Sequence, residues 1–158
     1  MRSILVNKWR TPDGTLLHSK HVHDYVSHKD KVSGETYFID GGASYCRMSV
    51  NAVPMTNECI YEDDPIEKIR EDYGRMTIDP TTKTSKYKLL KDMSNEHLEN
   101  AIVYNYNRGF GLTNKASIQY MRELIYRAQN HIVIRDKQHF ARENFNTNIT
   151  NSLNTDQL

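Results

Sequence analysis

Four of the chain's seven histidines lie between His18 and His28, in a stretch that also contains Asp24. Imidazole and carboxylate groups at close spacing are the ligands of zinc, iron or manganese sites, and they are also the acids and bases of many hydrolases. A Gly-Gly pair follows Asp40, and its backbone N–H groups could form a nest that binds an anion. This part of the chain therefore predicts a site without naming a reaction.

The strand expected through these histidines divides them between two faces. With a period of two, His21 and His23 lie on one face, whereas Asp24 and His28 lie on the other beside two valines. A carboxylate on an apolar face is costly unless it is paired. Asp24 and His28 are therefore predicted to be structural, with Asp24 buried and bonded to His28, Arg47 or backbone N–H groups. Because the histidines do not converge, we expect no bound metal and no cofactor.

The face that carries the remaining polar groups is predicted to bind a partner. Arg47 suits phosphate or carboxylate recognition, and the glycines would expose backbone donors beside it. A solvated face and an ordinary turn at the glycines are the alternatives that the sequence leaves open. The predicted site residues are His21, His23, Asp40, Gly41, Gly42, Tyr45 and Arg47.

Composition limits the classes of protein to consider. The chain has 158 residues and a net charge of +1, so it lacks the basic field that drives non-specific nucleic-acid binding. Its two cysteines form no CxxC pair, and the N-terminus lacks a signal-like apolar core, which favours a cytoplasmic protein without disulfides. No apolar run approaches the ~20 residues of a membrane span, so no membrane partner is expected.

The pattern of elements predicts an α+β fold, in which an N-terminal antiparallel β-meander packs against two or three C-terminal helices. Thr11 to Gly14 is a turn that should join two strands as a hairpin. The expected elements are a sheet over about residues 3–50 and helices over about 65–72, 94–107 and 114–130. We expect a single α+β domain over residues 1–144, followed by a flexible tail over 145–158.

Two further expectations concern the second half of the chain. Residues 76–91 show no stripe of useful length and are predicted to form an exposed loop. The third helix is predicted to bury an apolar stripe at the three-four spacing that helices use. That stripe consists of Ile118, Met121, Leu124, Ile125 and Ala128.

The pattern HVHDYV at 21–26, followed by YFIDGG at 37–42 with Tyr45 and Arg47, resembles a family of small bacteriophage proteins of unknown role. The resemblance extends to about Lys137. Short relatives carry paired cysteines around the histidine strand and resemble a zinc ribbon. Here the 12–14 turn and the 29–34 loop replace those cysteines, so zinc is not carried over. The resemblance implies a phage accessory protein and supplies no catalytic residues.

We therefore expect a phage protein that binds and modulates a host component in the host cytoplasm, without catalysis. The component would be a host defence or transcription protein, or a nucleotide signal. One alternative is a small metal-dependent hydrolase or nuclease that uses His21, His23 and Asp40. Another is a nucleic-acid-binding module that uses a basic strip. The strip contains Lys83, Lys86, Lys88 and Lys91 with Tyr87. The sequence leaves open whether the chain forms a homo-oligomer.

Overall fold

A computed structural model gives the fold of residues 2–79 and 81–136. The chain divides into two compact units, Met1–Lys91 and Asp92–Leu158. The tail expected over residues 145–158 lies outside the described residues, and the single domain over 1–144 stays a prediction.

The first sheet of the first unit is built on β1 (Ile4–Arg10). This strand pairs antiparallel with β2 (Leu16–Ser19), β6 (Thr56–Asn57) and β7 (Ile60–Tyr61). The turn between β1 and β2 closes through a hydrogen bond of 2.9 Å from the Gly14 amide to the Thr11 carbonyl. The predicted hairpin is therefore confirmed.

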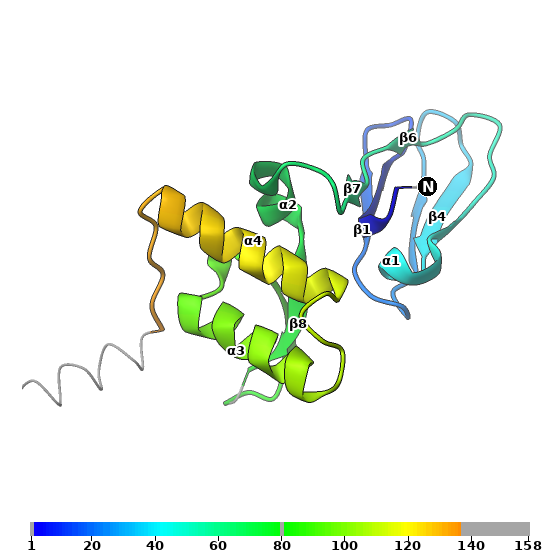
Figure 1. Cartoon of the computed structure of the whole chain (residues 1–158). Helices are drawn as coiled ribbons and strands as arrows, with labels where there is room; N and C mark the ends of the chain where they lie inside the picture. The colour runs from blue at the N-terminus through cyan, green and yellow to red at the C-terminus, as the bar shows by residue number, and fades with distance from the viewer. Residues whose placement is uncertain (1, 80, 137–158) are drawn as a thin grey trace, which may run out of the picture. The chain divides into compact units, whose positions relative to one another are not determined.

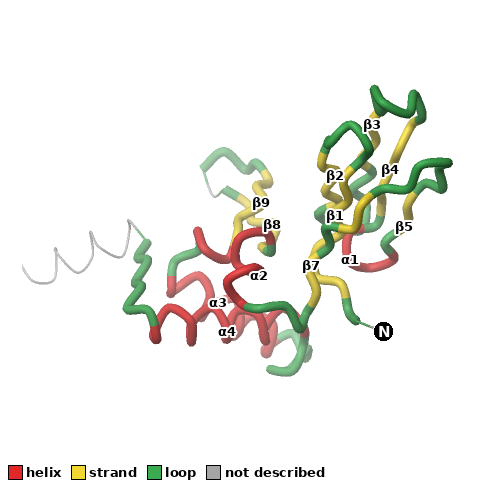
Figure 2. The backbone as a smooth tube through the Cα atoms, turned by 90° about the horizontal axis from the view of Figure 1, so that it is seen from above, coloured by secondary structure: helices red, strands yellow, loops and turns green. Residues whose placement is uncertain are grey.

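A second sheet contains β3 (Val26–Lys29), β4 (Thr36–Asp40) and β5 (Arg47–Met48), again antiparallel. A short helix, α1 (Gly42–Tyr45), connects β4 to β5. Figures 1 and 2 show these strands and α1 beside the first sheet. The strands are antiparallel as predicted, but β2 and β3 belong to different sheets, so the meander is interrupted where the chain passes from β2 to β3.

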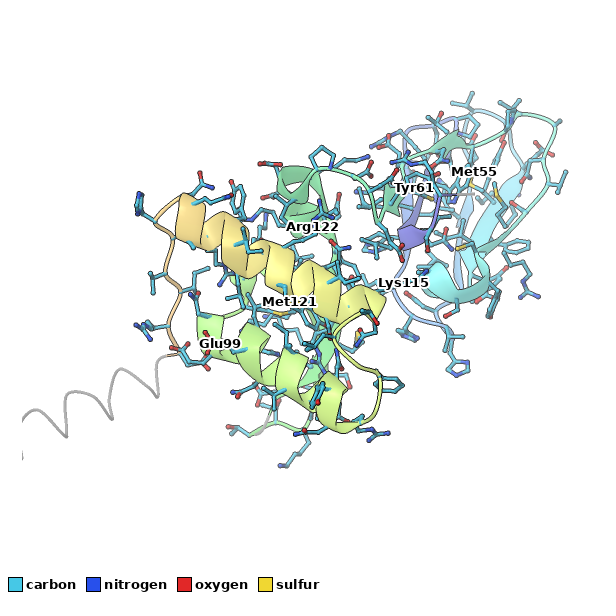
Figure 3. The ribbon with its side chains drawn as sticks, viewed as in Figure 1. Met55, Tyr61, Glu99, Lys115, Met121 and Arg122 are labelled. Carbon is cyan, nitrogen blue, oxygen red and sulfur yellow. The ribbon has the colours of Figure 1, made fainter. Side chains whose placement is uncertain are left out.

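The two sheets share one apolar core. Asn7 is fully buried beside it, and its side-chain amide donates to the Asp40 carbonyl across the two sheets at 3.2 Å. Burying this amide is tolerated because it is hydrogen-bonded. The core consists of Leu17, Tyr37, Ile39 and Met55, with Trp9, Val26 and Met48 packed against it; Met55 is labelled in Figure 3.

The helix predicted over 65–72 is observed as α2 (Ile66–Asp72), with Pro65 at its N-cap. Asp64 precedes Pro65 but does not cap the helix, because the N-cap has no side-chain hydrogen bond. The Asp64 carboxylate instead accepts from the Tyr61 amide at 2.9 Å and from the Lys68 ammonium at 3.0 Å. Asp64 therefore ties β7 to α2.

The prediction of an exposed loop over residues 76–91 is wrong for most of that range. β8 (Gly74–Ile78) and β9 (Ser85–Leu89) form an antiparallel two-stranded ribbon. The Tyr87 hydroxyl accepts a hydrogen bond of 2.9 Å from the Gly74 amide, which fixes one end of this ribbon.

In the described part of the second unit, two helices lie side by side, α3 (Asn95–Asn107) and α4 (Lys115–Gln129). Each begins at a polar N-cap, because the Ser94 and Asn114 side chains accept from backbone amides three residues later, both at 3.0 Å. The sequence predicted helices over 94–107 and 114–130 in these places.

The buried face of α4 differs from the predicted apolar stripe. Ile118, Ile125 and Ala128 are exposed, and Met121 and Leu124 are half-buried. The buried residues are Ser117, Gln119, Tyr120, Glu123 and Arg127. Polar groups can occupy this face because they are hydrogen-bonded. Glu123 accepts from Arg127 at 2.7 Å, Gln119 accepts from Arg122 at 2.9 Å, and the Ser117 hydroxyl accepts from Asn105 at 3.1 Å.

The predicted α+β class is confirmed, with antiparallel strands in the N-terminal half and helices in the C-terminal half. Among the described residues, no helix combines the length and apolar character needed to cross a bilayer.

Candidate functional site

The strand expected through His21 and His23 is instead a turn that precedes β3. Three hydrogen bonds at Asp24 close it. Its amide donates to the His21 carbonyl at 3.0 Å, its carbonyl accepts from the Ser19 hydroxyl at 2.6 Å, and its carboxylate accepts from the Lys20 amide at 2.7 Å. Aspartate side chains commonly compete with strand pairing in this way.

This turn corrects the expectation for Asp24. Its carboxylate is half-buried and bonds a backbone N–H, but it does not reach His28 or Arg47. His28 bonds Asp13, and Arg47 bonds Asp40. Alternation along a strand does not apply to residues in a turn, so the two-face argument fails there.

The two glycines after Asp40 serve close packing. Gly41 and Gly42 both have positive φ, +83° and +51°, and both are buried. A Cβ at Gly42 would lie 2.8 Å from the His21 carbonyl carbon, and one at Gly41 would overlap the Tyr45 ring. The Gly42 amide donates to the Ser19 hydroxyl at 2.9 Å. The Gly42 amide is therefore not the free donor that was expected from the sequence.

Tyr45 links α1 to the turn that carries the histidines. Its hydroxyl donates to the Val22 carbonyl at 3.0 Å, while its ring covers Gly41. His21 and His23 on this turn are exposed. The predicted site residues of the turn therefore lie next to those of the 40–47 segment, and the two glycines are buried between them.

The outer face of the second sheet lies beside this neighbourhood. In the register of β3, β4 and β5, Ser27 is opposite Phe38, and Asp40 is opposite Arg47. These four residues share one face, since directly opposed residues in an antiparallel pair point the same way. The other face carries Tyr37 and the rest of the core.

Three side chains on this outer face form an aromatic platform, which we define as Tyr25, Phe38 and Arg47. The Tyr25 and Phe38 rings are stacked, with centroids 5.3 Å apart and planes inclined by 26°. The Arg47 guanidinium carbon lies 5.9 Å from the Phe38 centroid. Tyr25 is 55% exposed, and the Arg47 side chain is 62% exposed.

Asp40 holds the arginine of the platform in place. One terminal nitrogen of Arg47 donates to the Asp40 carboxylate at 2.6 Å, and that carboxylate is itself nearly buried. This is the only hydrogen bond of the guanidinium within the described residues. Its remaining N–H groups are available to a ligand, since a guanidinium has five donors.

The sequence interpretation included Asp40 and Arg47 but missed Tyr25 and Phe38. A signal for Phe38 was present, because it alternates with Tyr37 and Ile39 along a predicted strand and must face away from them. An aromatic residue on the solvent side of a strand is a better indicator of a binding surface than one on the core side.

A second cluster joins the β1–β2 turn to the β3–β4 loop. His28 Nε2 lies 2.8 Å from an Asp13 oxygen that also accepts from the Lys31 amide at 3.0 Å. The Asp13 amide donates to Asp30 at 2.7 Å. The hydrogen bond with His28, together with those from backbone amides, holds the pKa of the Asp13 carboxyl well below its usual range. The cluster ties two turns together.

Asp13, His28 and Asp30 are also the only described residues that group as metal ligands, with ligand atoms within 4.8 Å of one another. Their oxygens are already engaged. Each Asp13 oxygen accepts two hydrogen bonds, one Asp30 oxygen accepts from Val32 and Ser33, and the other accepts from the Asp13 amide. A metal would have to displace these donors, so the donor set fits a metal poorly.

The residues of the hydrolase alternative do not assemble. His21 and His23 are exposed on the turn, while Asp40 is paired with Arg47. Their ligand atoms do not form a group of the kind found at Asp13 among the described residues.

Comparisons with models of protein families, with curated proteins and with solved structures find no match to this chain. The site must therefore be interpreted from its own geometry.

Proposed function

We propose that this chain is a non-catalytic binding protein whose ligand is a nucleotide, held by the aromatic platform on the outer face of the second sheet. One observation carries the proposal: the exposed Tyr25 ring is stacked on Phe38, and the Arg47 guanidinium lies next to the same Phe38 ring. Stacked aromatic side chains beside an arginine suit a planar base that is joined to a phosphate.

Each platform residue has a separate role in this proposal. Tyr25 offers a ring for stacking a base, and Phe38 fixes the orientation of that ring from below. Arg47 gives one N–H group to Asp40 and keeps others for a phosphate, which guanidinium groups bind through paired hydrogen bonds. Asp40 keeps the guanidinium at the platform when no ligand is bound.

The aromatic platform is proposed to bind its ligand without catalysing a reaction. The platform contains a phenol, a phenyl ring and a guanidinium, and none of them is paired with a histidine or cysteine as a general base or nucleophile would be. The exposed histidines of the neighbouring turn are suited to contacting a ligand's rim.

The biological part of the proposal rests on the resemblance to small phage proteins. A phage accessory protein that captures a host nucleotide signal in the host cytoplasm would inhibit the response that depends on that signal. Host modulation and anti-defence activity follow from the proposal if the ligand is such a signal.

Calorimetric titration of the full chain tests the platform directly. The panel should contain mononucleotides, cyclic nucleotides, dinucleotides and a short single-stranded oligonucleotide. We expect binding of at least one member, with Tyr25→Ala lowering its affinity roughly 5- to 150-fold, because stacking one base contributes about 1 to 3 kcal/mol. Arg47→Ala should lower affinity for the phosphorylated ligand more than for its nucleoside.

Tyr104→Ala is the matched control. Tyr104 is an equally exposed tyrosine, at 51%, with the Arg108 guanidinium 5.6 Å from its ring, but it lies on α3. Its replacement should leave the affinity unchanged. Failure of every nucleotide to bind, or equal effects of the two tyrosine variants, would remove the platform as the site.

A further inference from the structure

The ribbon formed by β8 and β9 has one strongly basic face. Arg75 is directly opposite Lys88, and Thr77 is directly opposite Lys86, so these four side chains point to the same side. Lys83 is exposed in the connecting turn. The other side carries Met76, Ile78 and Tyr87 in the alternate positions of the same register.

No ion pair within the described residues neutralises the four cations of the ribbon and its turn, Arg75, Lys83, Lys86 and Lys88. By contrast, Lys8 pairs with Asp72 and Lys91 pairs with Glu71, so these two carboxylates, which precede the ribbon in the sequence, are already used.

One carboxylate, Asp79, lies in the connecting turn. It accepts hydrogen bonds from the Thr81 and Thr82 amides, both at 2.8 Å, and so shapes the turn. The ribbon and its turn therefore carry four cations against one anion.

The arrangement of these cations works against folding. Like charges directly opposite each other on an antiparallel pair destabilise it, and Arg75 with Lys88 is such a pair. The chain's net charge is only +1, so the ribbon concentrates positive charge that the rest of the molecule balances. A polyanionic partner would remove the repulsion.

We propose that the basic face of this ribbon binds the phosphate backbone of double-stranded nucleic acid, at a site separate from the aromatic platform. A two-stranded antiparallel ribbon has the width that the major groove of B-form DNA admits. The basic face carries no aromatic side chain, whereas single-strand binding relies on aromatic stacking.

The one aromatic residue of the ribbon, Tyr87, is used on the opposite side. Its hydroxyl bonds the Gly74 amide, and its ring lies edge-on to His18 at 5.9 Å. Tyr87 therefore holds the ribbon to β2, which leaves the basic face to bind.

Fluorescence anisotropy with two unrelated 20-base-pair duplexes tests this inference on the full chain. We expect both duplexes to bind alike, and affinity to fall roughly 40- to 150-fold between 50 and 200 mM salt for three to four phosphate contacts. Lys86→Glu with Lys88→Glu should reduce the slope of log affinity against log salt by about 2.

Lys29→Glu with Lys31→Glu is the control for net charge, because both lysines are exposed; Lys29 is the last residue of β3, and Lys31 lies in the loop between β3 and β4. This control should keep the parent's salt slope, and melting curves should confirm that both variants are folded. No duplex binding by the parent, or equal losses in the two double variants, would overturn the proposal.

A single-stranded oligonucleotide separates this site from the platform. If it binds more tightly than the duplex, and Tyr25→Ala abolishes binding of both, nucleic acid is bound by the platform and the ribbon proposal fails. If Tyr25→Ala leaves duplex binding intact, the ribbon is supported whether or not the platform binds nucleotides.

Discussion

At the scale of single residues, His18 couples the stability of the first unit to pH. Its imidazole is half-buried, its Nε2 has no hydrogen-bond partner in the part of the chain that the structure describes, and its ring meets the Tyr87 ring edge-on. Burial disfavours the charged form and lowers the pKa of His18 to about 4. His18 is therefore neutral in the folded chain at neutral pH.

We predict that stability falls as the pH falls from about 6.5 to about 4. Over that range the unfolded chain protonates His18, whose unfolded pKa is about 6.5, and the folded chain does not. We expect a loss of about 1 to 3 kcal/mol, a range that allows for solvent screening of a half-buried group. Urea unfolding followed between pH 4 and pH 7.5 measures it.

His18→Phe keeps an aromatic ring against Tyr87 and removes the titrating group, so it should flatten this part of the pH profile. His23→Asn, on the exposed turn, should leave the profile as it is in the parent. A parent profile that is flat between pH 4 and 6.5 would show that His18 is hydrated in the folded state.

At the scale of elements, α4 is stabilised by an ion pair on its buried face. Glu123 accepts from the Arg127 Nε at 2.7 Å, and both side chains are almost fully buried. Arg127 also donates to the Met93 carbonyl at 2.8 Å and to the Asn95 side chain at 2.9 Å. The pair thereby connects α4 to the start of α3.

We predict that Glu123→Ala lowers the free energy of unfolding by about 3 to 5 kcal/mol, because it removes the carboxylate that pairs with a buried guanidinium. Glu123→Leu combined with Arg127→Met should cost less, since both charges of the pair are removed. Circular dichroism at 222 nm during urea unfolding measures both. Glu99→Ala, an exposed change on α3 that Figure 3 labels, should stay within about 0.5 kcal/mol of the parent.

The same helix shows where sequence patterns lose predictive power. The first residues of α3 and α4 can be predicted from Ser94 and Asn114, because an N-cap depends only on residues within one turn of the helix. The buried face of α4 does not follow, because an apolar stripe assumes that charged residues stay outside. Glu123 and Arg127 neutralise each other on the buried face. Arg127 is also held by Asn95, which is far away in the sequence.

Strand assignments divide in the same way. The hairpin at Gly14 was predictable from turn residues alone. The β8–β9 ribbon was missed because its basic face makes the sequence look like a polar loop, and pairing partners such as Gly74 and Leu89 are not adjacent in the chain. Asp24 converts a strand-like sequence into a turn through one side-chain bond.

The candidate site combines both cases. Arg47 was identified from its chemistry and Asp40 from its position before the glycines, and the structure pairs them. The strand expected through the histidines included Tyr25, which instead lies between the turn and β3. Its stacking on Phe38 could not be predicted without knowing where that turn ends. A binding surface made of residues from a turn, β4 and β5 is set by register, which composition does not reveal.

At the scale of the whole molecule, two spectroscopic signals report on different units. Trp9 is the only tryptophan in the chain and packs against the core of the first unit, with its indole N–H bonded to Asn7 at 3.0 Å. Most described helical residues belong to the second unit, in α3 and α4 with 13 and 15 residues, against 4 and 7 in α1 and α2.

We predict that the fluorescence of Trp9 and the helical dichroism change in a single unfolding transition. Among its described residues, the second unit buries few apolar side chains, chiefly Met93, Leu98, Ala101 and Tyr120. So small a core is not expected to be stable by itself. Glu123→Ala, which acts on the helices, should therefore lower the midpoint reported by Trp9 as much as the midpoint reported by dichroism. A Trp9 transition that stays at the parent's midpoint while the helical signal shifts would show that the units unfold independently, and the single domain expected over residues 1–144 would have to be given up.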